Sequence, residues 1–190
     1  MRRTSAARVV LSRRTFTSLA AGFFAAHGFN VRAATSPNER LNLAVVGIGG
    51  QGLTNLKAVA HENVVALCDV DERRGAKGFE VCPSARRFTD FRTMFDSLER
   101  QIDAVVISTP DHTHFHPAWW AMERGKHVYL EKPLAHEVEE VRRLCDAARA
   151  RKLATQLGSQ RHALEGLRHG VEIVMSGMLG EIREVHSWVA

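Results

Sequence analysis

The sequence predicts an α/β protein with a doubly wound, mostly parallel sheet. From residue 41 onward, apolar segments of strand length alternate with longer segments of helical periodicity, and the first apolar segment ends in a glycine-rich turn. Segments such as AVVI at residues 104–107 are apolar without a break, which indicates parallel strands covered by helices on both faces. Right-handed crossovers between such strands give the doubly wound arrangement.

Each element follows from these patterns in chain order. Strands are expected at the short apolar runs, near residues 42–46, 63–68, 104–108, 127–131 and 153–157, with a weaker candidate near 86–88. Helices are expected near residues 52–61, 72–78, 90–98, 114–124, 136–151 and 161–177. The helix at 136–151 has the clearest pattern, because Val138, Val141 and Leu144 recur on one face.

The first strand ends in GIGGQG, which fits the pattern G-x-G-x-x-G. Gly47 permits the tight turn, Gly49 lets the backbone approach a pyrophosphate, and Gly52 allows the next helix to pack close to the strand. The N-terminus of that helix offers unpaired N–H groups to phosphates. We therefore predict a dinucleotide-binding turn formed by Gly47, Ile48, Gly49, Gly50, Gln51 and Gly52.

Asp69 follows the second apolar run and lies 20 residues after Gly49. A carboxylate at this spacing is expected to accept hydrogen bonds from the adenosine ribose hydroxyls. It would also repel a 2′-phosphate, so NAD is the expected cofactor. NADP is the alternative, because Arg73 and Arg74 follow closely. The competing interpretation is a glycine turn in some other α/β protein with a chance aspartate.

Residues that follow the other strands are further candidates, because ligands of open α/β sheets bind beyond the carboxyl ends of the strands. Each of these strand ends carries polar residues, glycine or proline. The strand near 104–108 ends at Ser108, Thr109 and Pro110, the strand near 127–131 at Glu131, Lys132 and Pro133, and the strand near 153–157 at Gly158, Ser159 and Gln160.

Two patterns suggest a metal site or thiol chemistry, and neither is favoured. His112, His114 and His116 would share one face only in a strand, whereas the sequence around them predicts a turn entering a helix. We expect no metal, since no HExxH pattern or Cys/His cluster is present. The three cysteines are widely spaced, so we interpret them as free residues rather than as a disulfide framework.

The net charge of +5 belongs to the N-terminal segment. Residues 1–34 hold six arginines and no acidic residue, and the remaining 20 basic residues are balanced by 21 acidic ones. A nucleic-acid partner is therefore not expected.

The run SRRTF at 12–16 resembles a twin-arginine export signal, and the short apolar stretch after it predicts no stable membrane insertion. We expect a signal peptide at 1–34 and a periplasmic or otherwise exported protein that folds first in the cytoplasm. The alternative is a disordered basic arm.

The order of the motifs GIGGQG, CDVD, STPDHTH, GKHVYLEKP and LGSQRH is similar to that of the Gfo/Idh/MocA oxidoreductase family, over residues 41–190. The resemblance implies an NAD(P)-binding Rossmann domain at 35–158 and the start of a second, substrate-binding α/β domain at 159–190. The family's second catalytic segment, with an Asp and a His, is expected beyond Ala190. This chain would then supply the nucleotide-binding part without being catalytically complete.

The same resemblance assigns roles to individual residues. Lys132 would be the catalytic residue beside the nicotinamide, where its ammonium hydrogen-bonds the hydroxyl being oxidised and assists proton transfer. Burial and the positive nicotinamide would disfavour its charged form. His114 would begin a helix and line the same cleft. The remaining implied cofactor-binding residues are Ser108, Thr109, Pro110, Glu131 and Gln160.

The implied function is a nicotinamide-dependent oxidoreductase acting on a sugar, polyol or related small hydroxyl compound. One alternative is an NAD-dependent glycoside hydrolase that uses transient oxidation, and another is a non-catalytic nucleotide-binding module. We also expect a homo-oligomer formed through the C-terminal domain.

Overall fold

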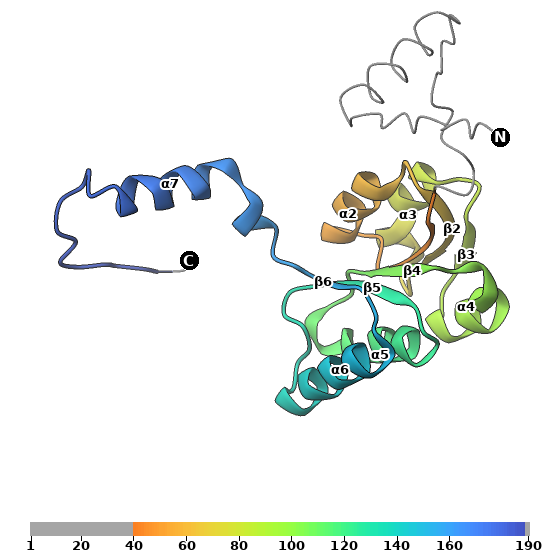
Figure 1. Ribbon diagram of the computed structural model, residues 1–190. Coiled ribbons are helices and arrows are strands. Elements are labelled where there is room, and N and C mark those ends of the chain that lie inside the picture. The colour runs from red at the N-terminus through yellow and green to blue at the C-terminus, as the bar shows by residue number, and fades with distance from the viewer. Residues whose placement is uncertain (1–39, 189–190) are drawn as a thin grey trace, which may run out of the picture. The chain divides into compact units, whose positions relative to one another are not determined.

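The computed structural model describes residues 40–188 (Figure 1). The predicted signal peptide at 1–34 lies outside these residues. Six strands form one sheet in the order β3-β2-β1-β4-β5-β6, and every neighbouring pair is parallel. The predicted doubly wound sheet is confirmed, together with the weak strand candidate, which forms one edge. The strands are β1 (Asn42–Val46), β2 (Asn63–Cys68), β3 (Arg86–Phe88), β4 (Ala104–Ile107), β5 (His127–Glu131) and β6 (Thr155–Gly158).

The helices lie where the sequence predicts them, with shifts at their ends. They are α2 (Gln51–Val59), α3 (Glu72–Val81), α4 (Phe91–Leu98), α5 (Phe115–Glu123), α6 (Val138–Arg151) and α7 (Glu165–Met175). The helix expected at 161–177 is divided into a 3-10 turn (Gln160–Ala163) and α7. The division falls at Leu164, whose backbone is extended with φ −69° and ψ 133°.

Helices cover both faces of the sheet (Figure 1). Helices α2 and α3 pack on one face through Leu56 and Phe79, and they contact Val45 of β1. Helices α4, α5 and α6 cover the other face, where the next residue of β1, Val46, is buried among their side chains. Alternation along a strand thus assigns neighbouring residues to different cores.

Strand β1 lies between β2 and β4, so the chain turns in opposite directions along the sheet from this strand. In an open α/β sheet such a reversal leaves a crevice at the carboxyl ends of the strands, and ligands bind there. The fold therefore places the predicted glycine turn, which directly follows β1, at the mouth of this crevice.

The segment after β6 has a different character. Residues 159–188 are exposed, and α7 has no buried residue. No strand is assigned between residues 159 and 188. Within the described residues 40–188, none of the helices has the length and apolar composition needed to cross a membrane.

Candidate functional site

A cavity of about 820 Å³ lies at the carboxyl ends of β1, β2 and β4, and we call it the strand-end cavity. Its volume is in the range of small-molecule and cofactor sites. Eight of the predicted site residues line it, namely Gly47, Gly49, Gly50, Gln51, Asp69, Ser108, Thr109 and Pro110. Ile48, Gly52, His114, Glu131, Lys132 and Gln160 are not among its lining residues.

The backbone around the glycine turn is tightly packed at Gly47, Gly49 and Gly52, the positions where the sequence predicts that glycine is required. Gly47 has φ +80°, and a Cβ there would lie 2.7 Å from the backbone oxygen of Ser108. At Gly52 a Cβ would overlap the carbonyl oxygen of Gly47, because α2 packs directly against the turn. A Cβ on Gly49 would lie 3.0 Å from the carbonyl oxygen of Arg74. The turn is therefore defined by close backbone contacts.

The residues around this turn fit the phosphates of a dinucleotide. Helix α2 begins after Gly50, which has φ +53° and no side chain to cap the helix. The N–H groups of Gly52 and Leu53 donate to the carbonyl oxygens of Gly49 and Gly50, at 2.9 and 3.2 Å. The positive end of the helix dipole at this turn favours an anion such as a phosphate. The buried hydroxyl oxygen of Thr109, another residue of the cavity wall, has no hydrogen-bond partner within the described part of the chain.

Asp69 is held in place by backbone groups on two sides. Its Oδ2 accepts the N–H of Ile48 at 2.9 Å, and its Oδ1 accepts the N–H of Asp71 at 3.0 Å. Ile48 is fully buried, so it serves the site through its backbone. The carboxylate of Asp69 lies in the wall of the strand-end cavity, where it retains acceptor capacity for ribose hydroxyls.

The next turn along the cavity wall is fixed by a helix cap. Asp71 caps α3 by accepting the backbone N–H groups of Arg73 and Arg74. These hydrogen bonds, that of Arg74 above all, hold the pKa of Asp71 below its ordinary value. The backbone that carries Asp69 is thereby tied to the start of α3.

Cys68 also lies in the cavity wall, but it is not a reactive thiol. Burial, followed by the negative charges of Asp69 and Asp90, raises its pKa to about 12. The group therefore remains protonated near neutral pH, whereas a nucleophilic cysteine acts as the thiolate.

His114 lies behind the cavity wall, not in the cleft that the resemblance implied. Its ring is 1% exposed and lies between two turns that follow strands. Nδ1 is 2.6 Å from the carbonyl oxygen of Pro133, and Nε2 is 2.7 Å from that of Thr109. His114 therefore connects the turn after β4 to the turn after β5.

Lys132 follows β5 directly and is exposed. Within residues 40–188 its side chain is not covered, although Glu131 at the end of the same strand is buried. The Lys132–Pro133 peptide bond is cis. Lys132 thus lies at the carboxyl edge of the sheet, next to the strand end that carries Thr109.

Glu131, one residue earlier, is buried and belongs to a hydrogen-bond network that the sequence did not predict. Its Oε1 accepts Nδ2 of Asn55 at 2.9 Å, and it also accepts Nε2 of Gln160. Asn55 lies on α2 and donates to Oγ of Ser108 at 2.9 Å as well. A polar residue on the buried stripe of α2, between Gly52 and Leu56, was the available signal for Asn55.

Gly158, at the end of β6, provides the space for this carboxylate. A Cβ on Gly158 would lie 2.7 Å from Oε1 and 2.9 Å from Oε2 of Glu131. The nearby hydroxyl of Tyr129 accepts Nε2 of Gln160 at 3.1 Å. Burial and then the negative charge of Glu131 raise the pKa of Tyr129.

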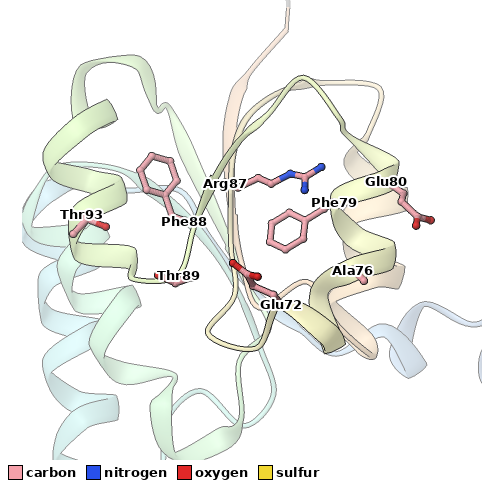
Figure 2. A pocket seen from close by; sticks show the side chains of 8 residues that line it. All are labelled: Glu72, Ala76, Phe79, Glu80, Arg87, Phe88, Thr89 and Thr93. Atoms are coloured by element: carbon pink, nitrogen blue, oxygen red, sulfur yellow. The ribbon is translucent and has the colours of Figure 1, made fainter.

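A second cavity, of about 610 Å³, lies between α3, β3 and α4 (Figure 2). Arg87 lies over the ring of Phe79 there, at 4.8 Å from its centroid, and Glu72 and Glu80 flank the opening. None of the predicted site residues lines this cavity. Across residues 40–188, no group of three or more His, Cys, Asp or Glu residues is arranged to hold a metal ion.

Comparison with known proteins identifies the domain that carries this site. Residues 41–159 match the model of the oxidoreductase family with the NAD-binding Rossmann fold, called Gfo/Idh/MocA. The chain belongs to the Gfo/Idh/MocA oxidoreductase family. The matched residues include the glycine turn, Asp69 and Lys132, and the domain is an NAD-binding Rossmann domain of this family.

Individual relatives agree with this assignment. Inositol 2-dehydrogenase 2 of Saccharopolyspora erythraea is 31% identical, and the match covers 77% of this chain and 44% of the relative. A glycosyl hydrolase family 109 protein of Solibacter usitatus is 30% identical, with 77% and 36% covered. Scyllo-inositol dehydrogenase from Lactobacillus casei, solved with NAD(H) and scyllo-inositol, is 25% identical with a TM-score of 0.64, covering 75% of this chain and 43% of its own. The chain thus spans less than half the length of these Gfo/Idh/MocA relatives.

Proposed function

We propose that the protein is an NAD-dependent dehydrogenase that oxidises a hydroxyl group of a sugar, a polyol or a related small molecule. The observation that carries the proposal is the position of Lys132. It follows β5 at the same edge of the sheet as the NAD site, is exposed, and adjoins the buried Glu131. The inositol dehydrogenases among the relatives support a polyhydroxylated substrate.

In this function some residues of the chain bind the cofactor, and Lys132 transfers the proton. The glycine turn binds the pyrophosphate, and Asp69 accepts hydrogen bonds from the adenosine ribose. NAD, when bound, supplies the hydride acceptor. Nζ of Lys132, as the neutral amine, accepts a hydrogen bond from the substrate hydroxyl and takes up its proton as the carbonyl forms.

Replacement of Lys132 by Met tests this role in the full-length protein. We expect turnover to fall by about 10²–10⁴-fold, the usual contribution of a general acid–base group. NAD affinity, measured by calorimetry, should change little, because the glycine turn and Asp69 hold the other half of the cofactor.

Lys126→Met is the matched control, since Lys126 precedes the same strand at the opposite edge of the sheet. It should leave turnover unchanged. A Lys132→Met protein with near-normal turnover on its true substrate would remove Lys132 from the mechanism.

A second candidate function is NAD-dependent glycoside hydrolysis through transient oxidation, and the glycosyl hydrolase family 109 relatives favour it. The two functions differ in net redox change. A dehydrogenase accumulates NADH in step with oxidised product, whereas the hydrolase releases a sugar with no net NADH. Absorbance of NADH during turnover of candidate polyols and glycosides separates them. A protein that binds NAD and turns over neither class would be a nucleotide-binding module.

The domain limits and the cellular location are part of the same proposal. Residues 1–34 serve as a twin-arginine signal, residues 35–158 form the NAD-binding domain, and residues 159–190 begin the substrate domain, through which the protein forms a homo-oligomer. The SRRTF run supports export of a protein that has already folded around its cofactor.

A further inference from the structure

Glu131 is a buried carboxylate without a cationic partner. It is 5% exposed. No ion pair joins it to a Lys, Arg or His side chain in the part of the chain that the structure describes. The adjacent Lys132 is exposed and reaches Glu131 only through its backbone N–H. Buried carboxylates are normally paired with a cation, so this one requires an explanation.

The hydrogen bonds of Glu131 orient the carboxylate but leave one oxygen poorly satisfied. Oε1 accepts from the side-chain amides of Asn55 and Gln160, and from the hydroxyl of Tyr129 at 3.5 Å. Within residues 40–188, Oε2 accepts only the backbone N–H of Lys132, at the long distance of 3.3 Å. The side chain is therefore held in one direction, and Oε2 is the less satisfied of its two oxygens.

Asn55 ties this carboxylate to the NAD site. Its Oδ1 accepts Nε2 of Gln51 at 3.1 Å, and its Nδ2 donates to both Ser108 and Glu131. Gln51 and Ser108 both line the strand-end cavity. Glu131 is thus one side chain away from the cavity wall.

The position of the nicotinamide follows from the fold. A dinucleotide lies across the crevice, with its pyrophosphate at the turn after β1 and its adenosine above β2. The nicotinamide then extends toward β4 and β5, where Glu131 ends its strand. This ring is positively charged in NAD⁺ and neutral in NADH.

We propose that Glu131 sets the redox preference of the site, as the buried anion that selects the positively charged nicotinamide of NAD⁺ over the neutral ring of NADH. The proposal rests on the placement of the nicotinamide in the proposed function. An unscreened carboxylate acts strongly on a nearby charge, whereas the exposed ammonium of Lys132 is weakened by solvent. The wild-type chain should therefore bind NAD⁺ about tenfold more tightly than NADH.

The test compares the dissociation constants of NAD⁺ and NADH in wild-type and Glu131→Gln chains by calorimetry. Glutamine keeps one oxygen as the acceptor for Asn55 and Gln160, removes the charge, and replaces the acceptor of the long Lys132 N–H bond by an NH2 group. We expect the tenfold preference for NAD⁺ to disappear, mainly through weaker NAD⁺ binding. An unchanged ratio in a folded variant overturns the proposal, because the carboxyl group would then carry no charge that the ring senses.

Asp69→Asn is the matched control, because it removes a carboxylate from the adenosine half, which is identical in both cofactor forms. It should weaken NAD⁺ and NADH by the same factor. If Asp69→Asn changes neither affinity, the proposed placement of the cofactor is wrong. If Asp69→Asn weakens both cofactors but Glu131→Gln leaves their affinity ratio unchanged, only the proposed role of Glu131 is wrong. If the Glu131→Gln chain does not fold, the test is the ratio of the NAD⁺ and NADH dissociation constants of the wild-type chain. NADH binding as tight as NAD⁺ binding then overturns the proposal.

Discussion

The two ends of the proposed NAD site are built in different ways. At the adenosine end, next to β1 and β2, the surface is made by backbone: the glycine turn, the N–H groups at the start of α2, and a carboxylate held by the backbone of Ile48 and Asp71. Toward the proposed nicotinamide end, at β4 and β5, the support lies behind the cavity wall and is made by side chains, with Glu131 accepting hydrogen bonds from Asn55 and Gln160.

This difference has a mechanical meaning. A backbone turn in which an added Cβ meets a carbonyl cannot adjust without moving the strand or the helix. A network of side chains can change rotamers and charge state while the sheet stays in place. The adenosine end therefore fixes the cofactor, and the nicotinamide end is where affinity for its two redox forms can be adjusted.

The largest effect is expected from Gly52→Ala. The new Cβ overlaps the carbonyl oxygen of Gly47, so α2 must move away from the turn. We expect the free energy of unfolding to fall by about 3 kcal/mol, at the upper end of overpacking costs, with loss of detectable NAD binding. Chemical denaturation and calorimetry measure the two.

Gly166→Ala provides the control, since an added Cβ at that helical glycine has no neighbour within 4 Å. It should retain full stability and NAD binding. Wild-type NAD affinity in Gly52→Ala would show that the close contact at the turn is not needed for the site.

Asp69→Asn should produce an intermediate effect on cofactor choice. Removing the charge weakens NAD binding by about tenfold, the size of one charged hydrogen bond, and removes the repulsion of a 2′-phosphate. We therefore expect the preference of the wild-type chain for NAD over NADP to fall by at least tenfold in side-by-side titrations. Tighter binding of NADP than NAD by the wild-type chain would contradict this assignment of Asp69.

The smallest effect is expected from Gly158→Ala, which tests the adjustable end. The three atoms nearest to its Cβ all belong to the end of the Glu131 side chain, so we expect the carboxylate to shift while the sheet persists. We expect thermal stability close to that of the wild type and a change of a few-fold in the ratio of NAD⁺ to NADH affinity. A loss of stability as large as that of Gly52→Ala would show that both ends are equally rigid.

The sequence predicted the local turns of the fold better than the contacts between distant residues, for a physical reason. The turn at Gly47–Gly52 and the strand end at Asp69 depend on local backbone geometry, which short motifs record. Asn55 and Glu131 are 76 positions apart in the sequence, so no local sequence pattern predicts their hydrogen bond. The sequence showed Gly158 only as part of the LGSQRH motif. Its role, which is to leave space for the carboxylate of Glu131, depends on the neighbouring strand.

The positions of two single residues show what a short motif leaves open. His114 was expected in the cleft, yet its ring lies between two backbone carbonyls behind the wall. Lys132 was expected to be buried beside the nicotinamide; it is exposed among residues 40–188, and its burial in the protein with bound cofactor stays a prediction. A motif gives the position of a residue along the chain, whereas burial depends on which other segments or ligands cover it.

The alternation along β1 has a consequence for how this domain unfolds. Val45 belongs to the core under α2 and α3, and Val46 belongs to the core under α4, α5 and α6. Disrupting either layer releases the strand that the other layer needs, so we expect the two layers to unfold as one cooperative unit. NAD bound at the end of β1 would then stabilise helices that it does not contact, on both faces of the sheet.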